Sequence, residues 1–217
     1  MSLIKSLLPP LILIFLVLSR PAHATDNNSG YWIGVFPHYK LTEKSSLSLQ
    51  AEFRHIGETS FGLWRPAFHY NFGENWNLGV GYDVFTTQNT EQRPWFEGNM
   101  FFKVLSLGQK FHFRARHETR FISNSSEAAY RTRVLALSSF RISNSLPLDG
   151  IIFDEYFYNE KTFSGKTNDY DRNWLGGRLK FNPEEQIFYE IGAFWENINN
   201  SVNSNGMVST LSVGGKF

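Results

Sequence analysis

Residues 46–55 read SLSLQAEFRH, and apolar and polar side chains alternate through the whole stretch. Leu47, Leu49, Ala51 and Phe53 fall on one parity, while serine, glutamine, glutamate and arginine fall on the other. Side chains of a β-strand point alternately to its two faces. The stretch therefore predicts a strand with one apolar face and one charged face.

The same alternation recurs along the chain. It is clear in 62–72, 76–86, 110–121 and 186–196, and less regular in 30–39, 93–104, 130–141, 150–159, 170–181 and 207–217. No stretch after residue 24 has the period of an amphipathic helix. Residues 25–217 are therefore predicted to form one all-β domain.

The connections between these segments alternate between short and longer polar ones, as in bacterial outer-membrane barrels with short periplasmic turns and longer extracellular loops. A soluble barrel or sandwich would alternate as well, with the apolar face turned inward. Strongly charged polar faces and aromatic residues at the segment ends favour the membrane barrel. These aromatic residues are Tyr31, Trp32, Trp76, Tyr130, Tyr158, Trp174 and Trp195.

We therefore predict a closed antiparallel transmembrane β-barrel of about 10–12 strands in the bacterial outer membrane. Even strand numbers are usual in such barrels, so twelve is favoured and ten is the alternative. Leu211, Val213, Gly215 and Phe217 alternate up to a terminal aromatic residue, which resembles the signal read by the barrel-insertion machinery. That machinery and the outer-membrane lipids are the predicted partners, and the oligomeric state stays open.

The composition excludes several other classes of protein. The 217 residues contain 21 Lys plus Arg and 20 Asp plus Glu, too balanced for a nucleic-acid-binding protein. The absence of cysteine excludes disulfides, iron–sulfur clusters and thiol nucleophiles. A mean hydropathy of −0.31 is too polar for a bundle of membrane helices. The histidines lack metal-ligand spacing, so neither a metal nor a cofactor is predicted.

Residues 1–24 form a separate segment. Lys5 precedes the apolar run Leu7–Leu18, and Ala22-His23-Ala24 ends the segment with small residues around one histidine. This layout predicts a secretory signal peptide cleaved after Ala24. The run is shorter than the roughly 20 residues that a transmembrane helix needs.

Several short motifs, taken in order, are similar to one known family. They are Arg65-Pro66 with Tyr70, Gly79-x-Gly81-Tyr82, Arg114-x-Arg116-x-Glu118-x-Arg120, Arg131-x-Arg133 and Asp154-Glu155-x-Phe157-x-Asn159. The chain resembles the domain-of-unknown-function 2490 family of bacterial outer-membrane β-barrel proteins. The resemblance implies a fold and a location but no activity, and it implies a basic residue where this chain has Trp174.

If the apolar faces meet lipid, the charged faces meet in the barrel interior. The predicted lumen charge network comprises Arg65, Glu97, Arg114, Arg116, Glu118, Arg120, Arg131, Arg133, Glu155, Arg178 and Glu190. Its simplest interpretation is structural, with paired charges that largely plug the lumen. The alternative is a small passive pore with a preference for anions.

An outer-membrane lipid-modifying hydrolase is a further alternative. His117 lies on the apolar parity beside Arg116, which makes it the best candidate for a catalytic base near lipid. The chain has no G-x-S-x-G nucleophile elbow, so no catalytic residue is assigned.

Overall fold

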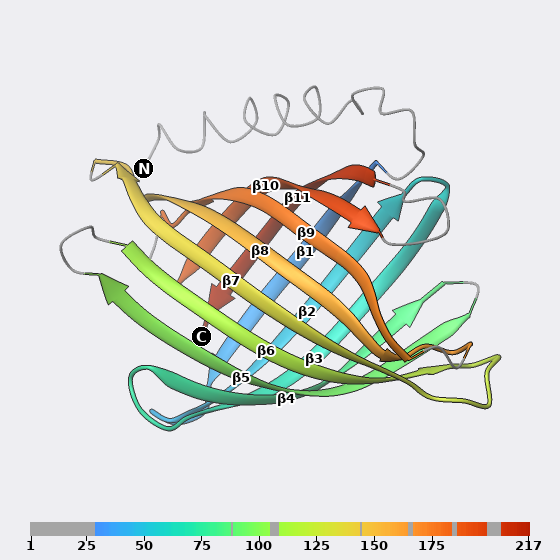
Figure 1. Ribbon diagram of the computed structural model, residues 1–217. Helices are drawn as coiled ribbons and strands as arrows, with labels where there is room; N and C mark the ends of the chain where they lie inside the picture. Colours follow the sequence, from blue (N-terminus) through green and yellow to red (C-terminus); the bar gives the residue numbers. More distant parts are fainter. Residues whose placement is uncertain are drawn as a thin grey trace.

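The computed structural model describes residues 29–87, 89–104, 109–143, 145–164, 167–183, 186–198 and 205–217. Their regular structure is entirely β, and eleven strands form a closed barrel (Figure 1). None of the described residues forms a helix long and apolar enough to cross a membrane. The strands are β1 (Gly30–Lys40), β2 (Ser45–Ile56), β3 (Thr59–Asn71), β4 (Trp76–Thr86), β5 (Thr90–Val104), β6 (Gln109–Ile122), β7 (Ala129–Ser143), β8 (Leu148–Lys161), β9 (Thr167–Phe181), β10 (Ile187–Ile198) and β11 (Asn205–Lys216).

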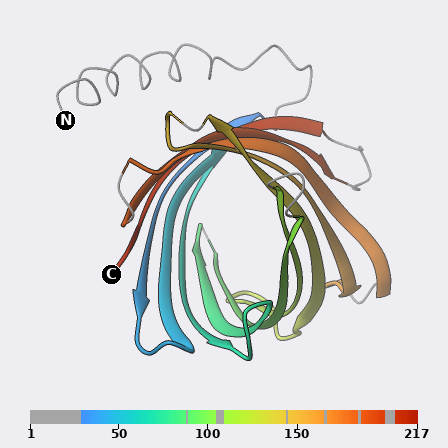
Figure 2. The same ribbon diagram turned by 90° about the vertical axis from the view of Figure 1, so that its left-hand side faces the viewer.

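The predicted closed all-β barrel of about 10–12 strands is confirmed, but the preference for an even number, twelve or else ten, is wrong. Each strand pairs antiparallel with the next along the chain, while β1 closes the ring by pairing parallel with β11, from Gly30 opposite Val208 to His38 opposite Lys216. An odd number of consecutive antiparallel strands leaves the first and last strand pointing the same way. The barrel therefore closes through one parallel ladder (Figure 2).

The parallel closure gives the barrel two distinguishable ends. We call the end where β1 and β11 both begin the Gly30 end, and the opposite end, where both finish, the Phe217 end. The connections at the two ends differ in length less than predicted, because the strands extend into the expected loops. At the Gly30 end only Gly57 and Glu58 separate β2 from β3, and Gly57 has a positive φ of 58°, which glycine adopts without strain.

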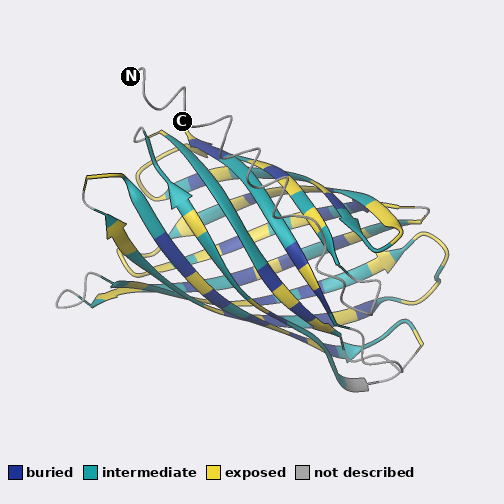
Figure 3. Cartoon of the chain, turned by 90° about the horizontal axis from the view of Figure 1, so that it is seen from above, coloured by how far each residue is buried: buried dark blue, intermediate teal, exposed yellow. Residues whose placement is uncertain are grey.

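The two faces of the wall differ sharply in chemistry. On β5, Phe96 is 60% exposed on the outside, whereas its neighbour Glu97 is 4% exposed on the inside. On β3, Trp64 is 53% exposed and Arg65 is 8% exposed. Buried and exposed residues alternate in this way along the strands (Figure 3). Apolar side chains thus cover the outside, and most buried charges lie inside.

Part of the interior is apolar, which the sequence pattern does not predict. Phe153, Phe157, Trp174 and Phe194 are buried in one cluster, and Trp32 packs against it. The prediction that Trp32 and Trp174 belong to an outer aromatic belt is therefore wrong. Tyr31, Trp76, Tyr130, Tyr158 and Trp195 are exposed on the outer surface.

Candidate functional site: a charged barrel interior

Glu118 is the centre of the largest ion-pair cluster in the interior. It comes from β6, its side chain is 0% exposed, and it accepts hydrogen bonds from two arginines of β7. Arg131 Nε lies 3.0 Å from Glu118 Oε2, and Arg133 Nη1 lies 2.9 Å from Oε1. Both carboxylate oxygens are thus bound, which a buried carboxylate needs if it is to stay charged.

The cluster continues through a second carboxylate, Glu155 of β8. Arg133 Nε donates to Glu155 Oε1 at 2.9 Å, and Arg114 Nη2 of β6 donates to the same oxygen at 2.6 Å. The Arg114–Glu155 contact passes over the inner face of β7, which separates the two strands. On the other side, Arg116 Nε donates to Glu97 Oε2 of β5 at 2.8 Å. Ion pairs on the inner face of the wall therefore link the four consecutive strands β5, β6, β7 and β8.

Arg65 belongs to a separate cluster on β2 to β5. Its Nε donates to Asp83 Oδ1 at 2.7 Å and its Nη2 to Asp83 Oδ2 at 2.5 Å, a two-point contact. The indole Nε1 of Trp95 also donates to Asp83 Oδ1, at 2.6 Å. Gly81 faces this tryptophan, and a Cβ at residue 81 would overlap the indole ring. The glycine therefore makes room for a buried aromatic hydrogen-bond donor.

The remaining predicted network residues pair elsewhere. Arg120 Nε donates to Glu91 Oε1 at 2.6 Å. Arg178 lies 3.2 Å from Glu190, which also binds Lys180 at 3.2 Å. Arg178 and Glu190 thus form a small group that shares no ion pair with the Glu118 cluster in the described part of the chain.

Two acidic residues of the interior lie at positions where the alternation does not predict an inward side chain. Glu91 binds Arg93 and Arg120, but the sequence pattern places residue 91 in a loop because the alternation of β5 becomes clear only later. Asp171 binds Arg131 and Arg172, although its parity is that of the outer face. On β9 the register shifts between Tyr170 and Arg172, which leaves Asp171 as an extra, bulged residue. A bulge redirects a side chain, and parity alone cannot reveal it.

Trp174 occupies the inward position where a basic residue was expected. Its Nε1 donates to Glu196 Oε1 at 2.7 Å, and Arg172 Nη1 donates to the same oxygen at 3.0 Å. Its ring lies 4.4 Å from that of Phe157, centroid to centroid. Trp174 thus joins the aromatic cluster to the charged network.

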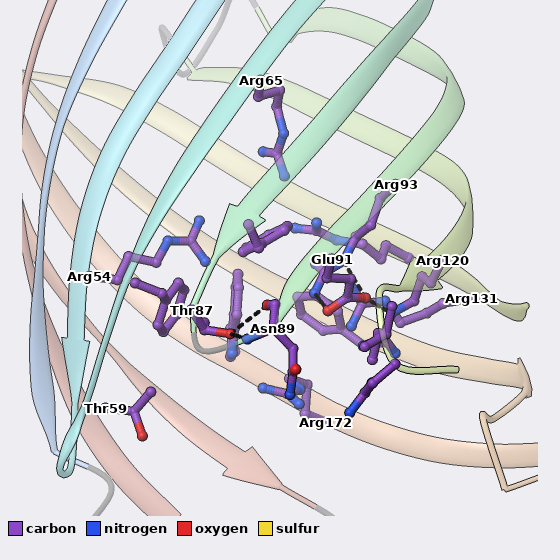
Figure 4. A pocket seen from close by; sticks show the side chains of 17 residues that line it. Arg54, Thr59, Arg65, Thr87, Asn89, Glu91, Arg93, Arg120, Arg131 and Arg172 are labelled. Atoms are coloured by element: carbon purple, nitrogen blue, oxygen red, sulfur yellow. Dashed lines mark hydrogen bonds and ion pairs between the residues drawn. The ribbon is translucent and has the colours of Figure 1, made fainter. Parts of the chain in front are cut away.

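Two cavities of the interior are lined by described residues. The larger, of about 430 Å³, lies at the Gly30 end, where Thr59, Thr87 and Asn89 line it (Figure 4). The smaller, of about 190 Å³, is lined by Glu155, Arg178 and Ser212 among others. The same four side chains line both cavities, and we call them the shared layer: Arg54, Arg65, Arg133 and Trp174.

This shared layer is held by contacts on several sides. Arg54 forms an ion pair with Glu52, and its guanidinium lies 3.7 Å from the centre of the Trp32 ring. Arg65 and Arg133 are held by Asp83 and by the Glu118 cluster, as described above. Moving any member of the layer would therefore break a buried ion pair or an aromatic contact.

His117, the candidate base, lies on the outer face. Its Nδ1 is 3.1 Å from Glu160 Oε1 and 3.3 Å from Thr132 Oγ1, while Thr132 Oγ1 donates to Glu160 Oε1 at 2.5 Å. A catalytic triad needs the hydroxyl on the histidine nitrogen opposite the carboxylate. Here the hydroxyl and the carboxylate share one nitrogen. Within the described residues, no three His, Asp or Glu side chains gather as metal ligands.

The predicted insertion signal lies on the closing strand. Leu211, Val213 and Gly215 pair with β10 on one side and β1 on the other. Phe217 is exposed, and its backbone N–H donates to the carbonyl oxygen of His38 at 2.8 Å. The predicted leader peptide, residues 1–24, lies outside the described residues.

A comparison with known families adds one finding. The model of a family described as "Protein of unknown function (DUF2490)" matches residues 29–207, which extend from the residue before β1 into β11. No curated protein matches the chain.

Proposed function

We propose a role for this chain from the premise that it belongs to the DUF2490 family, a family of β-barrel proteins of unknown function. The chain is an outer-membrane β-barrel whose interior is closed by ion pairs and aromatic side chains. Its role is structural, and it does not conduct ions at rest.

One observation carries the proposed location, namely the apolar outer surface. Exposed large apolar side chains occur on all eleven strands, for example Ile33 on β1, Val80 on β4 and Leu175 on β9. Soluble monomeric proteins rarely expose apolar patches larger than a few hundred Å². A hydrocarbon environment makes such a surface favourable, and barrel closure satisfies the backbone groups that lipid cannot.

The strand lengths fit a bilayer. The strands contain 11 to 15 residues. At about 3.3 Å per residue and a tilt of about 40°, twelve residues rise roughly 30 Å along the barrel axis. The apolar band of an outer-membrane barrel is about 25 Å tall, so the strands are long enough to span it. Export through a leader cleaved after Ala24 and insertion directed by Leu211, Val213, Gly215 and Phe217 complete the proposal.

Arginine substitutions on one outer face test the location. Val80 lies in the middle of β4 and Trp76 at its end, on the same face, and both side chains are more than half exposed. In lipid vesicles Val80→Arg should destabilise the barrel by about 2–4 kcal/mol and Trp76→Arg by about 0–1 kcal/mol, because the cost depends on membrane depth. Equal, small effects would reject the membrane orientation. Cell fractionation tests the outer membrane directly.

Planar-bilayer recording tests the closed interior. The layer between the two cavities predicts silence for the purified protein. The alternative, an anion-preferring pore, is supported by the arginines that line both cavities, and it predicts steady anion-selective currents. Such currents would reject the closed interior and favour the pore. The geometry around His117 gives no support to a lipid hydrolase.

A further inference from the structure

The larger cavity is strongly basic. Seven arginines line it, whereas Glu91 is the one acidic residue among the described residues of its lining. The carboxylates that balance these arginines, such as Asp83 and Glu118, contact them without lining the cavity. The space itself is therefore surrounded by guanidinium groups, which favour an anion.

Glu91 shows how an anion is held in this cavity. Arg93 Nε donates to Glu91 Oε1 and Arg93 Nη2 to Oε2, both at 2.8 Å, and Arg120 Nε donates to Oε1 at 2.6 Å. This forked contact is the geometry by which arginine recognises carboxylate and phosphate. Glu91 thus acts as a tethered anion between two of the arginines (Figure 4).

The arginines are fixed in place before any ligand arrives. The guanidinium of Arg93 lies 3.7 Å from the centre of the Phe85 ring, and that of Arg133 lies 4.5 Å from the centre of the Phe157 ring. Such stacking lowers the conformational entropy that binding would otherwise lose. Phe61 and Ile122 also line the cavity, so a ligand would meet apolar side chains as well as guanidinium groups.

Uncharged polar side chains complete the lining near the end of the barrel. Thr59, Thr87, Asn89 and Asn124 carry hydroxyl and amide groups, which can bind the hydroxyl groups of a sugar or polyol. The volume of about 430 Å³ is within the usual range for small-molecule sites. The cavity lies inside the ring of strands, where the acyl chains of a lipid cannot follow a headgroup.

We propose that this cavity binds a small, water-soluble phosphate ester of a sugar or polyol, and that Glu91 weakens the binding by competing for Arg93 and Arg120. The guanidinium groups bind the phosphate, and the threonine and asparagine side chains form hydrogen bonds with the hydroxyl groups of the ligand. The site would make the barrel a binding protein for phosphorylated solutes, a role independent of whether the interior conducts.

Calorimetric titration of the full mature chain in detergent tests the proposal, with glucose 6-phosphate, inorganic phosphate and glucose as probes. Glucose 6-phosphate should bind most tightly, inorganic phosphate more weakly, and glucose not measurably. Glu91→Gln should tighten binding of glucose 6-phosphate about tenfold, and Arg120→Gln should weaken it about tenfold, the scale of one unit charge acting over about 10 Å at an effective dielectric of about 20.

Glu190→Gln is the matched control. Glu190 also bridges two basic residues, its side chain is 11% exposed against 13% for Glu91, and it does not line the cavity. Its substitution should leave the affinity unchanged. Absence of binding to the wild type, weaker or unchanged binding by Glu91→Gln, or an equal gain in Glu190→Gln would overturn the proposal. If the protein binds phospholipid micelles more tightly than it binds glucose 6-phosphate, the assignment to soluble solutes is overturned. Heat-modifiable gel migration identifies the folded fraction of each variant, so a folding defect is not mistaken for lost binding.

Discussion

Glu118→Gln should destabilise the barrel more than any exposed charge substitution. Glu118 is fully buried, and its partners Arg131 and Arg133 have side chains 3% and 6% exposed. Removing one partner of a buried ion pair costs about 3–5 kcal/mol. In this variant Arg131 retains its ion pair with Asp171, and Arg133 retains its ion pair with Glu155. The side-chain oxygen of the new glutamine can still accept a hydrogen bond. We therefore expect the lower part of that range, about 3 kcal/mol.

Urea unfolding in lipid vesicles, followed by tryptophan fluorescence, gives the free energy of unfolding by linear extrapolation. Glu127→Gln is the control, because Glu127 pairs with Lys161 at 3.0 Å while their side chains are 56% and 36% exposed. An exposed pair contributes about 0–1 kcal/mol. If Glu118→Gln loses no more stability than Glu127→Gln, the ion pairs are not what stabilises the interior, and the reasoning fails.

Three further predictions follow from the geometry of the wall and the interior. Of two epitope tags, one placed directly before Gly30 and one after Phe217, only one should bind antibody on intact cells, because the parallel closure puts them at opposite ends of the barrel. Equal accessibility of both tags would contradict the eleven-strand ring. Gly81→Val should cost about 1–3 kcal/mol in urea unfolding by overlapping Trp95, whereas Gly177→Val, whose Cβ would meet only an ordinary contact, should be nearly neutral. Trp174→Ala should produce channel openings in planar bilayers by joining the two cavities, and silence there would show that other members of the layer suffice.

The strands could be predicted because each position in them obeys one local rule. In the middle of β2, β3 and β4 large apolar residues keep a period of two, and the structure places them on the outer face, as with Phe53, Trp64 and Val80. The alternation marks eleven segments, which is the observed number of strands, but the rule of even strand numbers led to twelve or ten, because the sequence does not show how the first and last strands meet. The pattern in 30–39 indicates a strand but carries no information on whether its neighbour runs parallel or antiparallel.

The pairing of charges could not be predicted for a related reason. Arg114 finds Glu155 on a strand two places away, and Arg131 finds Asp171 only because β9 contains a bulge. Both contacts depend on register, which local sequence specifies weakly. The inward Trp174 is a further example, since its apolar ring favours the outer face while its indole N–H needs an interior acceptor.

The same alternation has opposite consequences in water and in a bilayer, which is why the outer face decides the proposed location. In water this barrel would expose Trp64, Phe96 and their apolar neighbours to solvent, and it would keep Glu118 and its arginines away from solvent. Both faces would then raise the free energy of the folded barrel. In hydrocarbon the outer face becomes favourable, and only the buried charges remain to be compensated. The buried charged residues are six arginines and five carboxylates, and each of them has an ion-pair partner in the interior. This distribution of side chains is the physical argument behind the proposed membrane location.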